Sequence, residues 1–176
     1  WIKTVFASCR EAPQHTYLFL TKNPERYCTY EDADPSGIPT QKNFWYGTTA
    51  NCAADFQGHC RATTLAWFHG EYSANTFLSI EPLMESIGDA GLASLYNFQW
   101  LIIGAMTGPG SKARQPKREW VEEIVKAARD FGVPVFMKKN LANVWGDNLI
   151  QQYPVGMVQD DAQGPAPLPR CKKCEY

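Results

Sequence analysis

The stretch Thr76–Leu83, with the sequence TFLSIEPL, has the pattern of a buried strand that stops at a carboxylate and a proline. An apolar run without alternation is typical of a strand covered on both faces, as in a parallel sheet. A bare carboxylate at the end of such a run costs desolvation free energy. Glu81 therefore needs a partner or solvent, and the other strands indicate where it finds one.

Four other short apolar runs repeat this pattern at start-to-start spacings of 24 to 34 residues, which leaves room for a helix in each gap. This rhythm predicts an α/β fold with a parallel sheet of about five βα units. A complete eightfold barrel needs about 250 residues, so the chain of 176 predicts a partial (β/α) barrel over residues 1–159, followed by a polar tail. The four further runs are His15–Lys22, Phe44–Thr49, Trp100–Met106 and Pro134–Lys139.

Helices are predicted between these strands. Pro116–Phe131 gives the clearest pattern, because Pro116 suits a first helical position and Gly132 followed by Pro134 ends a helix. An apolar stripe predicts a helix at Ile2–Cys9, and a less regular pattern predicts others at Ala53–Phe68 and Leu141–Tyr153. Residues 29–42 are rich in Asp, Pro and Gly and predict a loop, and residues 160–176 predict a Pro-rich tail.

Composition limits the classes of function. A hydrophobic content of 44% is enough for a core, while a formal net charge of −1 and a pI of about 6.3 give no global attraction to nucleic acid or to an anionic membrane. No run approaches the roughly 18 apolar residues of a membrane span. We expect a cytoplasmic protein with no membrane partner, whose six cysteines are reduced thiols rather than disulfides.

Polar residues follow the predicted strands where the chain leaves the sheet. Because the carboxyl ends of parallel strands meet at one edge, where ligands bind, these residues predict a ligand site. Glu81 lies there with Lys22 and Lys138 as candidate counter-charges, which would keep the carboxylate ionised. Solvated loop-entry residues without a task are the alternative interpretation. The predicted ligand-binding residues are Lys22, Thr48, Thr49, Ser79, Glu81, Gly104 and Lys138.

Two further patterns predict weaker sites. The loop Thr107–Arg114 carries two glycines and the cations Lys112 and Arg114, and it predicts an anion site for a phosphate or carboxylate. Cys171 and Cys174 have the spacing of half a zinc site, which Cys52, His59 and Cys60 would complete only if the tail folded back. A tail without metal is the alternative.

Several segments in order resemble a known family. They are Leu20–Arg26 (LTKNPER), the Trp45–Thr49 strand end, Phe77–Leu83, Trp100–Gly110 (WLIIGAMTGPG) and Gly132–Lys138 (GVPVFMK). Over roughly residues 1–145 they are similar to the carboxyl-terminal half of a phage-associated protein family of unassigned function. That family is related to radical SAM (S-adenosylmethionine) enzymes, with the spore photoproduct lyase among its distant relatives.

The resemblance implies the substrate side of a radical-SAM-like barrel, lined by Lys22, Thr48, Ser79, Glu81, Gly104 and Lys138. Full-length relatives imply S-adenosylmethionine and an iron–sulfur cluster held by a Cys-x-x-x-Cys-x-x-Cys loop. The cysteine intervals here, 19, 24, 8, 111 and 3, contain no such loop, so this chain alone is expected to hold no cluster. Because the first predicted element is a helix, we expect a missing N-terminal half, or a second copy in a homodimer, to cover the sheet edge.

Three functions therefore remain open at this stage, the last of them a zinc-stabilised structural piece built around Cys171 and Cys174. The first is a phage-type protein of unknown activity that contributes the substrate-side half of the barrel and binds an unknown small molecule. The second is a small α/β domain that binds a phosphorylated or nucleic-acid ligand through Lys112, Arg114, Lys117, Arg118 and Lys138.

Overall fold

The computed structural model describes residues 1–32, 37–57 and 61–157. The predicted tail, with Cys171 and Cys174, lies outside the described residues, as do His59 and Cys60. Within the described residues five strands form one sheet. They are β1 (Tyr17–Thr21), β2 (Phe44–Thr49), β3 (Asn75–Ile80), β4 (Leu101–Ile103) and β5 (Val135–Met137).

The described strands are parallel throughout and lie side by side in the order β1-β2-β3-β4-β5, the order in which they follow one another along the chain. The register places Thr21 opposite Thr48, Thr49 opposite Ser79, and Ile103 opposite Met137. The predicted α/β class and parallel sheet are confirmed. The partial barrel stays a prediction, because the described strands form an open sheet.

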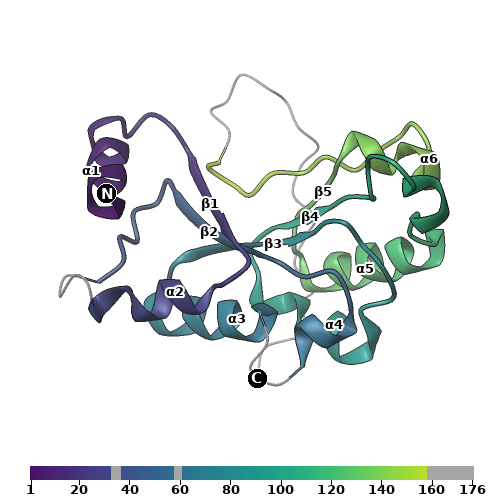
Figure 1. The fold of residues 1–176 in the computed structure, drawn as a ribbon, viewed down its shortest axis with the longest axis horizontal. Coiled ribbons are helices and arrows are strands. Elements are labelled where there is room, and N and C mark those ends of the chain that lie inside the picture. The colour runs from purple at the N-terminus through teal and green to yellow at the C-terminus, as the bar shows by residue number, and fades with distance from the viewer. Residues whose placement is uncertain (33–36, 58–60, 158–176) are drawn as a thin grey trace.

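Helices α2, α3, α4 and α5 lie on one side of this sheet (Figure 1). α5 forms largely as its sequence indicates, but it begins at Arg118, so Pro116 lies before the helix and not at its first position. Val121, Ile124, Val125 and Ala128 make its buried stripe, and Gly132 ends it with a φ of 70° that favours glycine. The helices are α1 (Ile2–Glu11), α2 (Glu25–Cys28), α3 (Arg61–Tyr72), α4 (Gly88–Ser94), α5 (Arg118–Phe131) and α6 (Ala142–Trp145).

Some predicted helices differ from the observed ones. The helix expected over Ala53–Phe68 is a 3₁₀ turn at Ala53–Phe56 and, after the undescribed residues 58–60, helix α3. Of the helix expected over Leu141–Tyr153, only α6 near its start is observed. Further along this segment, Gln151 pairs antiparallel with Phe136 instead of continuing a helix. Short 3₁₀ helices complete the described elements at Thr29–Asp32, Leu95–Asn97, Ser111–Arg114 and Lys139–Leu141.

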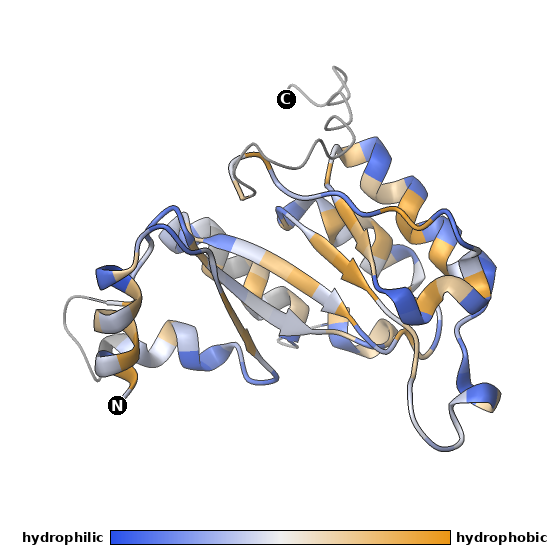
Figure 2. Cartoon of the chain, turned by 90° about the horizontal axis from the view of Figure 1, so that it is seen from above, coloured by the Kyte–Doolittle hydropathy of each residue, from blue (hydrophilic) through white to orange (hydrophobic). Residues whose placement is uncertain are grey.

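Alternating side chains of the strands point to the two faces of the sheet. One set packs with the helices in the main core, which includes Tyr46, Leu78 and Ile103. The other set lies on what we call the open face, the face opposite α2–α5, where Trp45, Phe77 and Trp100 form a second cluster with Met157 against it. Figure 2 shows the sheet from above, with hydrophobic residues concentrated in the strands and in the helix surfaces turned toward them.

The two edges of the sheet differ. The segment after α6 covers the outer side of β5, since Met137 N–H donates to Ile150 O (2.7 Å) and Gln152 N–H donates to Val135 O (2.8 Å). At the other edge the N–H of Tyr17 points to Asn43, so the backbone groups of Leu18 and Leu20 point away from β2. Their side chains are 47% and 54% exposed. Among the described residues, only the β5 edge is therefore covered by chain.

Candidate functional site

Strand pairing continues past the ends of β3, β4 and β5. Gly104 N–H donates to Ile80 O (3.1 Å), Leu83 N–H donates to Gly104 O (3.0 Å), and Lys138 N–H donates to Ile103 O (2.9 Å). These bonds place Glu81, Gly104 and Lys138 at one level across three strands, at the carboxyl edge of the sheet. We call these three residues together with Asn140 the rim.

Glu81 and Lys138 form an ion pair at the rim. Lys138 Nζ lies 2.8 Å from Glu81 Oε1 and donates a hydrogen bond of 2.9 Å to Oε2. The side chains are 24% and 46% exposed, so water and solutes reach both charges. Proximity to the ammonium group compensates the carboxylate that the sequence places at the end of the apolar strand.

Gly104 gives the Glu81 side chain its path to Lys138. A Cβ at position 104 would lie 2.7 Å from Glu81 Oε1 and 2.8 Å from its Cγ, closer than such atoms approach. The carboxylate therefore lies over the strand between its own strand and β5. A glycine is required there by space rather than by backbone conformation.

Asn140 holds the same region together. Its Nδ2 donates to Ala105 O (2.7 Å), its Oδ1 accepts from Ala105 N–H (3.2 Å), and Nδ2 also reaches Glu81 Oε1 at 3.4 Å. The residue was not among the predicted site residues. Its signal in the sequence is its position, since it is the first residue beyond the fifth apolar run, two residues after Lys138.

Thr49 and Ser79 lie one level below the rim on the open face. They are opposite each other in the register, two residues before the level of Glu81, and both are buried. Ile102 and Phe136 continue this level on β4 and β5 and are partly exposed. The edge thus combines charges above, hydroxyl groups beneath them, and apolar side chains beside the hydroxyls.

Two predicted residues lie apart from this group. Thr48 is fully buried on the helix side of the sheet, where its Oγ1 donates to Thr21 O (2.9 Å). Lys22 follows β1 and is exposed, separated from β3 by the whole of β2, or about 10 Å at the usual strand spacing. Of the two candidate counter-charges, the structure pairs Lys138 with Glu81 and not Lys22.

The predicted anion site lies in the loop after β4. Lys112 and Arg114 are exposed in a 3₁₀ turn, which Gln115 Nε2 anchors by donating to Met106 O (3.1 Å) and Ser111 O (2.8 Å). Arg118 is already engaged, since it pairs with Glu122 at 2.8 Å and lies 5.0 Å from the Trp145 ring centroid. Anion binding at this loop stays a prediction.

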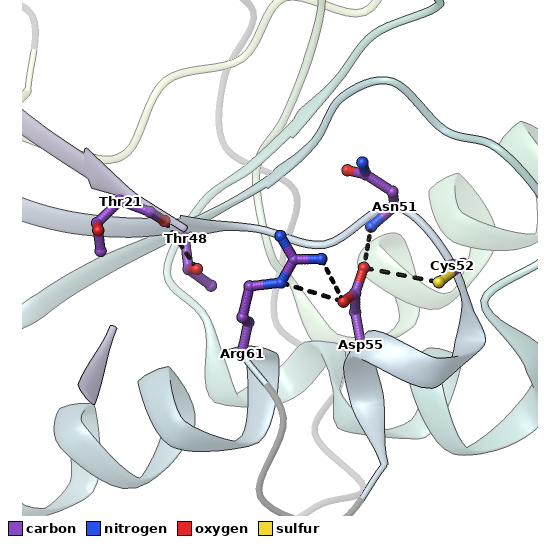
Figure 3. A network of polar contacts seen from close by, with 6 residues as sticks. All are labelled: Thr21, Thr48, Asn51, Cys52, Asp55 and Arg61. Carbon is purple, nitrogen blue, oxygen red and sulfur yellow. Dashed lines mark hydrogen bonds and ion pairs between the residues drawn. The ribbon is translucent and has the colours of Figure 1, made fainter. Parts of the chain in front are cut away.

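A second polar cluster surrounds Asp55, at the turn between β2 and α3 (Figure 3). Asp55 Oδ1 accepts from Arg61 Nε (3.1 Å) and Nη2, and Oδ2 accepts from the Asn51 N–H (2.7 Å) and the Cys52 thiol (3.7 Å). Burial alone would raise the pKa of Asp55, but these donors and the Arg61 charge lower it below its ordinary value. Both oxygens of this carboxylate accept two hydrogen bonds from neighbouring groups of the chain, so we interpret Asp55 as a structural residue.

Thiol groups show no metal site within the described ranges. Cys9 is buried in the core, and Cys28 and Cys52 are partly exposed free thiols. No group of three or more His, Cys, Asp or Glu side chains in the described part of the chain is placed to hold a metal ion. The described residues therefore do not fit an iron–sulfur cluster. The zinc prediction at Cys171 and Cys174 falls outside them.

No helix in the described part of the chain is both long and apolar enough to cross a membrane.

Comparison with known proteins adds one finding. No curated protein and no solved structure matches the chain. A family model with the description "Protein of unknown function (DUF5131)" matches residues 1–162, which include all of the described sheet and its helices. The chain therefore belongs to the DUF5131 family.

Proposed function

We propose that the chain is the substrate side of a radical-SAM-like barrel in a phage-associated protein, and that it binds a small polar molecule at the rim. One observation carries the proposal. An exposed carboxylate–ammonium pair lies at the carboxyl edge of a parallel sheet, on the face that the helices leave free. Parallel α/β sheets bind their ligands at this edge.

Three features support a ligand site over a chance surface pair. The ion pair joins β3 to β5 across a glycine that leaves room for it. Asn140 fixes the neighbouring backbone through both of its amide atoms. The hydroxyl-bearing residue Ser79 lies one level beneath Glu81 on the same face, with Thr49 opposite it on β2, and both are buried. The radical-SAM relationship itself is supported by the resemblance of the ordered motifs, and the cluster would have to come from outside this chain.

Chemical-shift mapping tests the proposal. The nitrogen-15-labelled chain is titrated with a library of small polyols, amines, carboxylates and amino acids. We expect the amide shifts of the best binders to converge on Glu81, Gly104, Ala105 and Lys138. Glu81→Gln should weaken this binding at least about tenfold, the value of one lost charged hydrogen bond. Glu122→Gln, which breaks the exposed Arg118–Glu122 pair on α5, is the matched control and should leave it unchanged.

Two results would overturn the proposal. One is a library in which no compound shifts the rim amides. The other is a set of binders whose shifts converge on a different part of the molecule, such as the loop with Lys112 and Arg114.

A further inference from the structure

The charges of the rim restrict the class of ligand, if the rim is the binding site proposed above. Glu81 and Lys138 compensate each other, and each has only this one ion-pair partner among the described residues. The pair is partly exposed, so a ligand can approach both groups at once. Its net charge is zero.

A ligand with a single charge fits this pair poorly. A carboxylate or phosphate that takes Lys138 leaves Glu81 without its cation, and an amine that takes Glu81 leaves Lys138 without its anion. Returning one member of this partly exposed pair to solvent gives up the attraction between the two charges, which offsets part of what the new contact contributes. A zwitterion avoids this cost, because its ammonium group meets Glu81 while its carboxylate meets Lys138.

The positions of the two charges suit an α-amino acid. The carboxylate of Glu81 lies against Gly104 and within reach of Asn140 Nδ2. Lys138 Nζ stays within 2.9 Å of both of its oxygens. The two binding groups are therefore adjacent, as are the ammonium and carboxylate groups on either side of one α-carbon.

The surroundings also indicate the ligand's side chain. Phe136 and Ile102 precede Lys138 and Gly104 by two residues on the same face. Both pack against the Trp100 cluster, and Phe136 also contacts Tyr153, but both keep a partly exposed surface. An apolar or aromatic substituent would contact them while the charged end occupies the rim. We propose that the rim binds the zwitterionic end of an α-amino acid, or of a derivative that keeps this end free, with an apolar side chain.

Three probes that differ by one charged group test this inference. L-phenylalanine carries both charges, 2-phenylethylamine lacks the carboxylate, and 3-phenylpropionate lacks the amine. We expect L-phenylalanine to shift the rim amides and each analogue to bind at least about tenfold more weakly, the value of one lost charged hydrogen bond. Glu81→Gln and Lys138→Met should each weaken L-phenylalanine binding by a similar factor, and Glu122→Gln should not.

An analogue that binds the rim as tightly as L-phenylalanine would overturn the inference. So would an L-phenylalanine titration that leaves the rim unshifted while other library compounds shift it, and in that case the rim remains a ligand site of another class. A rim that no compound shifts would overturn both this inference and the proposed function. Retained dispersion of the amide spectrum in each variant shows that the fold is intact.

Discussion

Asp55 and Glu81 are two carboxylates near the same edge of the sheet, and their surroundings give them different roles. Asp55 is buried and accepts hydrogen bonds from a backbone amide, a guanidinium group and a thiol. Glu81 is more exposed, and Lys138 and Asn140 supply its contacts. The first carboxylate has no capacity left for a ligand, whereas the second still faces solvent.

Replacing Asp55 by Asn should destabilise the fold by about 2–3 kcal/mol, because the Arg61 guanidinium loses its anion and the Asn51 N–H loses a charged acceptor. Urea denaturation at pH 7 measures the change. Glu122→Gln is the matched control, since it breaks an exposed pair and should cost less than about 0.5 kcal/mol. Equal losses for the two variants would show that Asp55 is not a structural anchor.

The same carboxylate predicts a pH dependence. Its native pKa is lowered, so the unfolded state binds more protons and stability rises with pH. The contribution is complete above the unfolded pKa of about 3.9 and disappears as pH falls through the native pKa. The stability gap between wild type and Asp55→Asn should therefore stay constant above about pH 5 and narrow below about pH 4. A gap that widens in acid would contradict the lowered pKa.

At the scale of the strands, two glycines on the open face leave room for side chains of β3 and of the residue that follows it. Gly47 on β2 lies under the ring of Phe77, which a Cβ would approach to 2.3 Å. Gly104 lies under the Glu81 side chain. The first contact is with a ring that is only 2% exposed and packs on Trp100, whereas the second is with the end of a flexible, partly exposed side chain.

Alanine at the two positions should therefore have different effects. Gly47→Ala should cost about 2–3 kcal/mol, because the Phe77 ring has no room to move. Gly104→Ala should cost less than about 1 kcal/mol in stability, because Glu81 swings toward solvent, but it should weaken ligand binding at the rim. Urea denaturation and the rim titration measure the two effects. A Gly104→Ala variant that binds as well as wild type would show that ligand binding does not depend on Glu81 lying over Gly104.

The sequence predicted the strands because continuous apolar runs mark buried parallel strands, and all five were found. It did not predict α4, whose Gly88 and Gly91 weaken the helical pattern, nor the antiparallel pairing of Gln151, which depends on where the chain meets β5. Thr48 and Thr49 show why site prediction is harder. Adjacent residues of a strand face opposite sides, and the sequence alone does not tell which side carries the helices.

At the scale of the molecule, the open sheet is incomplete as a barrel. β5 is covered by the chain that follows α6, while the outer edge of β1 exposes Leu18 and Leu20. Any strand that extends the sheet would therefore add at β1, on the side away from the rim pair. That an N-terminal half or a second copy covers this edge stays a prediction.

Anaerobic reconstitution tests whether this chain can hold an iron–sulfur cluster by itself. The purified chain, treated with iron and sulfide, should stay colourless, because its cysteines lack the spacing of a cluster loop and the described thiols are scattered. Visible absorption spectroscopy and iron analysis of the desalted protein provide the measurement. A broad band in the violet-blue with stoichiometric iron would show that this chain holds a cluster after all.

We infer that the Glu81–Lys138 pair serves a ligand rather than the fold, and the free energy of unfolding of Glu81→Gln distinguishes the two roles. A partly exposed pair at a ligand site contributes little to stability, so we predict a loss of less than about 1 kcal/mol in urea denaturation at pH 7. A loss above about 3 kcal/mol would contradict the claim, because it would identify the pair as a structural connection between β3 and β5.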